Sequence, residues 1–194
     1  MAKVDKLAKM RHRYTANFIA KHIPEGARVL EIGGGKQVSY WLLAKKKYDL
    51  VTVNIGAQAD YVLNIEKDSL EELGEKFRYV TMFEVIEHLE NPMWALRNIR
   101  SVMEKNALFL GSTPNRFDPY FFLGAKINED HNYVFDALTV KHLLNKCGFK
   151  PIEVKSRVLP IKLSTKERLF VPIDLSKLVP TGRVTFWVAT CADS

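Results

Sequence analysis

The sequence is poor in cysteine and has no long apolar run. Its 194 residues include only Cys147 and Cys191, which lie far apart, so free thiols are expected. No apolar run approaches the ~18 residues that a membrane-spanning helix needs. The first residues are basic but lack the uninterrupted apolar segment and small-residue cleavage site of a secretory signal. These absences predict a cytoplasmic protein without a membrane span.

The charge is positive but not concentrated. Lysine and arginine number 29 against 22 acidic residues, giving a formal net charge of +7. An excess of this sign suits anionic partners such as nucleic acid or a charged metabolite. Because it is spread along the chain, a solvated surface explains it better. Nucleic acid is therefore a possible partner but not the favoured one.

Apolar periodicity predicts strands that alternate with helices. Expected strands cover residues 28–32, 49–55, 61–63, 79–83, 107–112, 152–158 and 184–190. Expected helices cover a first segment that ends before Pro24, then residues 38–46 and 70–76, a helix starting at Pro92 with apolar positions to Met103, and one capped by Asp136. Asn106 can adopt the left-handed conformation that closes a helix. The alternation predicts one largely parallel sheet covered on both faces.

Two stretches interrupt this alternation. Residues 114–135 are rich in aromatics, including Phe117, Tyr120, Phe121 and Phe122, and residues 159–183 contain three prolines together with Lys162, Lys166 and Arg168. Loops of this length in a compact domain are usually functional or disordered. We therefore expect a single domain over residues 1–194 with two lid-like insertions, whose aromatic and basic side chains could contact a flat or anionic substrate or simply pack.

A glycine turn follows the first strand, in the order Glu31-Ile-Gly33-Gly34-Gly35. Glycine permits positive φ and lets the backbone approach a ligand at the start of a helix. The dinucleotide fingerprint G-x-G-x-x-G would need a last glycine where the sequence has Val38. The turn thus favours a nucleotide-like ligand other than a nicotinamide dinucleotide, and a tight turn without a ligand remains open.

Three ordered segments carry a family resemblance. Residues 29–35, the run Phe83-Glu-Val-Ile-Glu-His-Leu-Glu-Asn-Pro92, and Ser112-Thr-Pro-Asn115 together resemble the class I S-adenosylmethionine-dependent methyltransferases, of the type 11/12-like kind. The branch that includes the ubiquinone-biosynthesis O-methyltransferases looks most similar. The resemblance covers about residues 28–149. It implies a three-layer, doubly wound Rossmann-like sheet of order 3-2-1-4-5-7-6 with the last strand antiparallel.

The resemblance also implies a cofactor site. S-adenosyl-L-methionine would be held by residues of the glycine turn and of the neighbouring strand ends, namely Glu31, Gly33, Gly34, Gly35, Asn54, Asn64, Phe83 and Glu84. At Asn54 and Asn64 the family has acids, so this chain would offer amide oxygens to the ribose and adenine instead. Such oxygens lose the strength of a charge-assisted hydrogen bond. The implied function is methyl transfer to oxygen or nitrogen of a small molecule; a degenerate, non-catalytic relative is an alternative.

The acidic and histidine residues after the fourth strand allow three interpretations. Glu84, Glu87 and Glu90 could simply stabilise a helix start. His88, or His131 from the first insertion, could be a general base for a substrate hydroxyl. Finally, the set Glu84, Glu87, His88 and His131 resembles the metal ligands of small-RNA 3′-end 2′-O-methyltransferases, which would imply a metal-dependent RNA enzyme.

Overall fold

The structure is a computed structural model that describes residues 2–34, 47–56, 58–118, 129–157 and 184–191, with backbone alone for residues 2–10 and 157. Its seven strands form one sheet in the order β3-β2-β1-β4-β5-β7-β6, in which β7 runs antiparallel to both neighbours. The predicted strand order and the antiparallel last strand are confirmed. The strands are β1 (Arg28–Ile32), β2 (Asp49–Asn54), β3 (Tyr61–Val62), β4 (Phe77–Phe83), β5 (Met103–Pro114), β6 (Phe149–Arg157) and β7 (Val184–Cys191).

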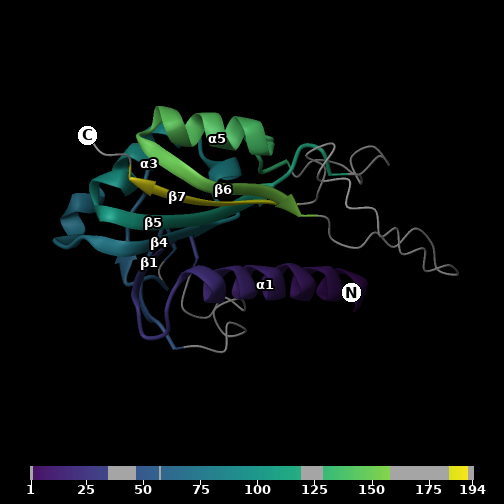
Figure 1. The fold of residues 1–194 in the computed structure, drawn as a ribbon, viewed down its shortest axis with the longest axis horizontal. Helices are drawn as coiled ribbons and strands as arrows, with labels where there is room; N and C mark the ends of the chain where they lie inside the picture. Colours follow the sequence, from purple (N-terminus) through teal and green to yellow (C-terminus); the bar gives the residue numbers. More distant parts are fainter. Residues whose placement is uncertain (1, 35–46, 57, 119–128, 158–183, 192–194) are drawn as a thin grey trace, which may run out of the picture.

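Helices cover both faces of the sheet, as Figure 1 shows. The helical elements are α1 (Ala2–His22), the 3-10 turns η1 (Leu70–Leu73) and η2 (Ile86–His88), α3 (Pro92–Ser101) and α5 (Ala137–Lys146). On one face α3 and α5 bury Leu96 and Leu144 in the larger core. On the other, Ile19 of α1 packs in a second core with Phe186 of β7. Burial on both faces explains the continuous apolar strands, and the fold is the predicted three-layer one.

Several predicted boundaries needed correction. The predicted helix over residues 70–76 is only the turn η1, because Gly74 takes the left-handed conformation with φ of 69°. Helix α3 ends at Ser101, and Met103, expected on its apolar face, already belongs to β5. Asn106 does take positive φ, at 59°, but within β5, where the pairing with β4 changes register. Its left-handed conformation therefore accommodates a bulge rather than closing a helix.

The last predicted helix is confirmed together with its cap. Asp136 accepts a hydrogen bond from the backbone N–H of Thr139, whose side chain contacts the Asp136 backbone in return. This capping box begins α5, and Gly148, with φ of 82°, follows its end. Several predicted features lie outside the described residues. They are Gly35, the helix over residues 38–46, residues 119–128 with Tyr120, Phe121 and Phe122, and residues 158–183 with Lys162, Lys166 and Arg168.

The pairing of parallel strands brings three chain segments to one edge of the sheet. Ile32 of β1 pairs with Met82 of β4, and Phe83 pairs with Ser112 of β5. The residues that follow β1 and β4 therefore leave the sheet side by side, at the carboxyl ends where open α/β sheets bind ligands. No helix among the described residues has both the length and the apolar character needed to cross a membrane.

Candidate active site

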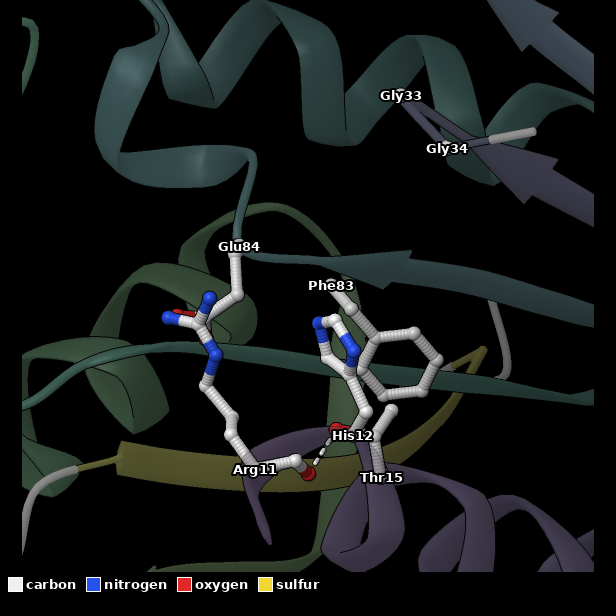
Figure 2. Close-up of a pocket in the computed structure, with 7 residues that line it drawn as sticks. All are labelled: Arg11, His12, Thr15, Gly33, Gly34, Phe83 and Glu84. Carbon is white, nitrogen blue, oxygen red and sulfur yellow. Dashed lines mark hydrogen bonds and ion pairs between the residues drawn. The ribbon is translucent and has the colours of Figure 1, made fainter. Parts of the chain in front are cut away.

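The glycine turn after β1 requires glycine for a steric reason. Gly33 has φ of 79°, and a Cβ there would collide with the side chain of Val85, which follows β4. Its N–H donates to the carbonyl of Val53 at 2.8 Å, which fixes the turn to the end of β2. Gly34 continues the turn into the pocket drawn in Figure 2. The close approach of the β1 and β4 ends thus depends on the missing side chain.

Asn54 holds this turn from the end of β2. Its Nδ2 donates to the carbonyl oxygen of Gly33 at 2.9 Å and to that of Gly34 at 3.4 Å. A carboxylate could not replace it in this role, since an ionised acid only accepts. The Oδ1 oxygen has no partner among the described residues, so it can still accept from a ligand hydroxyl. The departure from the family's acid therefore has a local structural reason.

Two other predicted cofactor residues have structural partners. Glu31 is fully buried and accepts a short hydrogen bond from the Thr81 hydroxyl, which joins β1 to β4 beneath the turn. Asn64 organises the turn after β3, since its Oδ1 accepts from the Glu66 N–H at 2.9 Å and its own N–H donates to Asp68 at 2.7 Å. Neither side chain is among those that line the pocket beside the glycines.

That pocket has a volume of about 160 Å³. It is lined by Arg11, His12, Thr15, Gly33, Gly34, Phe83 and Glu84. Gly33, Gly34, Phe83 and Glu84 were predicted to gather here, and the structure brings them together. The three residues from α1 were missed by sequence reasoning, because they belong to no motif and reach the site only through the packing of α1 on the sheet.

Glu84 occupies an unusual position at the end of β4. It has φ of 55°, in the left-handed region that residues with a side chain seldom adopt. Its N–H donates to the Ser112 carbonyl at 2.9 Å, and its carboxylate accepts from the Ser112 hydroxyl at 2.7 Å and from Arg11 Nη1 at 3.0 Å. These contacts join α1, β4 and β5. Conformations of this kind cluster at functional sites.

Glu87 is a buried carboxyl group on η2. Burial is the main cause that raises its pKa from 4.5 to about 8, and the charge of Glu84 raises it further. The Thr113 hydroxyl donates to its Oε2 at 3.1 Å and opposes the shift only in part. The carboxyl group of Glu87 is therefore protonated at neutral pH.

His88 and His131 meet beside Glu87. Their rings contact edge to face with centroids 4.8 Å apart. His88 Nδ1 donates to the carbonyl oxygen of Asp130 at 2.9 Å, because a carbonyl oxygen can only accept. Burial, followed by the proximity of His88, lowers the pKa of His131. Ligand atoms from Glu87, His88 and His131 all lie within 4.8 Å of one another, and Glu84 is not part of this group.

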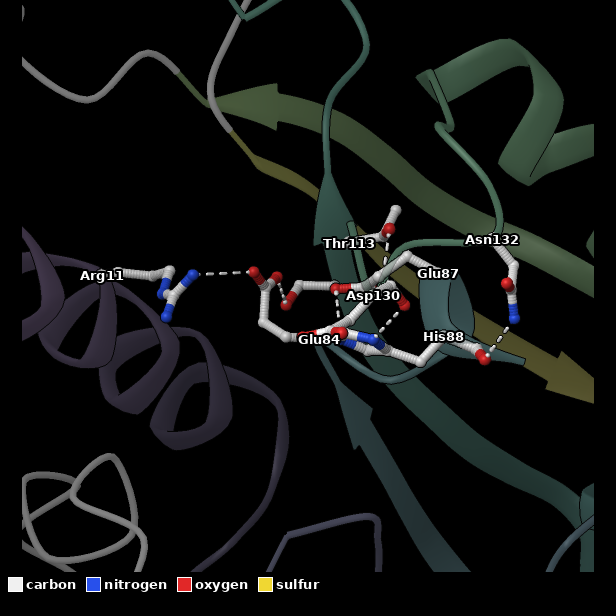
Figure 3. Close-up of polar contacts among 8 residues, drawn as sticks. Arg11, Glu84, Glu87, His88, Thr113, Asp130 and Asn132 are labelled. Atoms are coloured by element: carbon white, nitrogen blue, oxygen red, sulfur yellow. Dashed lines mark hydrogen bonds and ion pairs between the residues drawn. The ribbon is translucent and has the colours of Figure 1, made fainter. Parts of the chain in front are cut away.

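The segment that carries His131 is held to η2 by its backbone. The N–H groups of Asn132 and Tyr133 donate to the carbonyl of Glu87 at 2.8 and 3.2 Å. Asn132 Nδ2 donates to the His88 carbonyl at 2.8 Å, as Figure 3 shows. In the same view Arg11 contacts Glu84, and the contacts of His88 with Asp130 and Asn132 form a separate group. The histidine of the first insertion thus lies at the same sheet edge as the glycine turn.

The comparison with protein families agrees with this geometry. A family model described as a methyltransferase domain matches residues 5–154. The chain belongs to this family. It is an S-adenosylmethionine-dependent methyltransferase, and its cofactor is S-adenosyl-L-methionine. A search of curated proteins finds no match.

Solved structures share the fold at low sequence identity. A SAM-dependent methyltransferase from Archaeoglobus fulgidus is 17% identical, with 92% of this chain and 94% of that chain covered and a TM-score of 0.63. The 1,6-didemethyltoxoflavin-N1-methyltransferase of Burkholderia thailandensis is 13% identical, with 94% of this chain and 78% of that chain covered and a TM-score of 0.62. The small RNA methyltransferase HEN1 is 17% identical, with 96% of the chain described here but only 25% of the HEN1 chain covered and a TM-score of 0.63.

The role of Asn54 can be tested through stability. Asn54→Asp removes both donated hydrogen bonds and brings negative oxygen toward two carbonyl oxygens. We expect the free energy of unfolding to fall by about 1–2 kcal/mol at neutral pH, which lowers Tm by a few degrees. Thermal unfolding followed by circular dichroism measures this shift. Asn17→Asp, on the exposed side of α1, is the matched control and should leave Tm unchanged; equal stability of both variants would contradict the role.

The protonated state of Glu87 predicts a pH effect on the metal-free protein. Since its folded pKa lies above its unfolded value, the folded state retains a proton that the unfolded chain releases between pH 4.5 and about 8. Stability should therefore fall as pH rises through this window, by on the order of a few kcal/mol. Glu87→Gln should remove this loss, whereas Glu90→Gln, an exposed control, should not. Urea unfolding with chelator at pH 5 and pH 8 measures the change in stability. If the wild type and Glu87→Gln lose the same stability between these two pH values, the prediction is wrong.

Proposed function

We infer that this methyltransferase transfers the methyl group to oxygen or nitrogen of a small-molecule acceptor, with His131 as the general base. The observation that carries this proposal is the contact of His88 with His131 at the sheet edge that also bears the glycine turn. One edge then offers a cofactor pocket and a proton acceptor. Methyl transfer needs the acceptor aligned with the bound cofactor, and a positioned base assists the reaction by taking the acceptor's proton.

The cofactor would bind along the ends of β1, β2 and β4. The open backbone of Gly33 and Gly34 and the Oδ1 oxygen of Asn54 fit a nucleoside that carries an amino acid, while Phe83 and Glu84 line the far wall. Glu31 would support the turn from beneath, and Asn64 would reach the adenine end only if its turn adjusts. When bound, S-adenosylmethionine supplies the methyl group from its sulfonium.

The histidine pair suits proton transfer at neutral pH. A lowered pKa keeps the His131 imidazole neutral, so its ring nitrogen can accept a proton. The Asp130 carbonyl accepts a hydrogen bond from His88 Nδ1 and so orients the ring that contacts His131. A positioned base of this kind contributes typically ~10²–10⁴-fold to rate. The acceptor would lose its proton to this pair as the new bond to carbon forms.

A small acceptor is favoured by the relatives. The Burkholderia neighbour was solved with bound 1,6-didemethyltoxoflavin and S-adenosylhomocysteine, and its name describes it as an N1-methyltransferase. Phe117, next to Arg116 with the guanidinium 5.4 Å from its ring centroid, adds a flat surface after β5 that could contact a planar acceptor.

Turnover tests the base. A panel of hydroxyl and amine acceptors is assayed for production of S-adenosylhomocysteine, and His131→Ala is then compared on the best acceptor. We expect a loss of about 10²–10⁴-fold in kcat with unchanged cofactor affinity, because the ring acts only on the acceptor's proton. His142→Ala, an exposed histidine of α5, is the matched control and should retain full activity.

The results of these binding and turnover experiments distinguish the hypotheses for the cofactor site, for catalysis and for the base. No binding of S-adenosylhomocysteine at millimolar concentration by calorimetry would contradict the cofactor site. Binding without turnover on any acceptor would support a non-catalytic relative. Unchanged turnover of His131→Ala would exclude the base while leaving methyl transfer intact, since in-line positioning alone can support that reaction.

A second candidate function is favoured by the grouping of Glu87, His88 and His131. Their mutual distances within 4.8 Å suit three ligands of one ion. His88 donates Nδ1–H to a backbone carbonyl, the usual arrangement that orients a metal-bound imidazole through its other nitrogen. One carboxylate with two imidazoles suits Mn²⁺ or Fe²⁺ better than Mg²⁺. One neighbour is named as a small RNA methyltransferase. The resemblance of these ligands to those of the small-RNA 3′-end 2′-O-methyltransferases would make a ribose 2′-hydroxyl of RNA the corresponding acceptor.

Metal dependence distinguishes this candidate. It predicts that chelator abolishes activity, that Mn²⁺ restores it, and that Glu87→Gln and His131→Ala lose Mn²⁺ affinity to a similar extent, by about 10-fold or more. Glu90→Gln should bind Mn²⁺ as the wild type does. For a metal-free base, chelator has no effect and Glu87→Gln keeps most activity, because glutamine replaces an already protonated carboxyl group. Titration of Mn²⁺ by calorimetry, alongside the assay, measures both.

A further inference from the structure

Helix α1 contributes the charged wall of the pocket. Figure 2 shows Arg11, His12 and Thr15 reaching from α1 toward Glu84 and Phe83, with Gly33 and Gly34 on the opposite side. The volume of about 160 Å³ is well below the ~300–1,000 Å³ of sites that enclose a drug-sized ligand. This pocket therefore accommodates one end of the cofactor rather than the whole molecule.

The pocket contains one positive and one negative side chain in contact. Arg11 Nη1 lies 3.0 Å from Glu84 Oε2, and the two side chains are 41% and 21% exposed. The pair is thus accessible from the pocket rather than sealed in the core. Glu84 uses its other oxygen for Ser112, whereas the Nη2 and Nε donors of Arg11 have no partner among the described residues.

The amino-acid end of the cofactor is complementary to this pair. It carries a carboxylate and an ammonium group on one carbon, so it matches a site with a cation and an anion a few ångströms apart. A guanidinium has five donors in a fixed planar arrangement and binds a carboxylate bidentately. Burial and the charge of Arg11 both lower the pKa of His12, which leaves Arg11 as the cation of the pocket at neutral pH.

We propose that Arg11 binds the α-carboxylate of the methionine moiety while Glu84 faces its ammonium group. This inference rests on the cofactor assignment and adds a binding residue that lies outside the sheet and its motifs. It also gives α1 a function: the helix covers the amino-acid end of the site and contributes a charge that distinguishes complete cofactor from derivatives without the carboxylate.

Two ligands and two arginine variants test the proposal by calorimetry. S-adenosylhomocysteine carries the carboxylate, and its decarboxylated analogue, 5′-(3-aminopropylthio)-5′-deoxyadenosine, lacks only that group. Arg11→Met should lower the affinity for S-adenosylhomocysteine by about 10- to 100-fold, the range for a hydrogen bond to a charged group. The affinity for the analogue should stay within about twofold of the wild-type value. Arg13→Met, an exposed arginine two positions along the same helix, should change neither.

Each other outcome contradicts the proposal in a distinct way. Equal weakening of both ligands would give Arg11 a structural role through Glu84 instead of a contact with the carboxylate. Unchanged affinity for both would remove Arg11 from the site. No binding of either ligand by the wild type would overturn the cofactor site itself, whereas binding of S-adenosylhomocysteine with no preference over the analogue would overturn only the proposal.

Discussion

The hydrogen bonds of Glu84 determine how the chain leaves the sheet at the functional edge. A residue with a side chain in the left-handed region costs about 1–3 kcal/mol, and here two bonds to Ser112 and one to Arg11 offset that cost. Because Glu84 directly follows the last residue of β4, its conformation sets the direction of η2. The positions of Glu87 and His88 follow from that direction, and so does the contact of α1 with the site.

The same carboxylate shapes the electrostatics of the edge. Arg11 pairs with Glu84, whereas Glu87 is buried close to that negative charge and keeps its proton. His131, with a lowered pKa, is neutral as well. At neutral pH the edge therefore holds the Arg11–Glu84 ion pair, a protonated Glu87 and a neutral His131. A neutral imidazole suits a positively charged sulfonium cofactor, since an imidazolium beside it would repel the methyl donor.

The sequence was sufficient for much of the fold, because the strands are buried on both faces and local signals mark the ends of several elements. The alternation of strands with helices, the Asp136 cap and the positive φ of Asn106 were predictable on this basis, whereas the strand order was predicted from the resemblance to the methyltransferase family. The contribution of α1 to the pocket was not predictable, because the helix is positioned by contacts between residues far apart in the sequence. Phe18 and Phe186 are an example, with ring centroids 5.0 Å apart. Such tertiary packing leaves no local pattern.

The candidate site shows the same division between local and long-range information. The sequence indicated Gly33 and Glu84 as neighbours through their motifs, but it could not reveal that the amide of Asn54 donates to the turn, because that depends on the orientation of a side chain. His131 is the instructive case. Its two neighbours hold it: the Asp130 carbonyl contacts His88 Nδ1, and the Asn132 N–H donates to the Glu87 carbonyl. The backbone therefore determines where the ring lies, and the ring alone determines the chemistry, so truncating it removes a base or a ligand without releasing the segment that carries it.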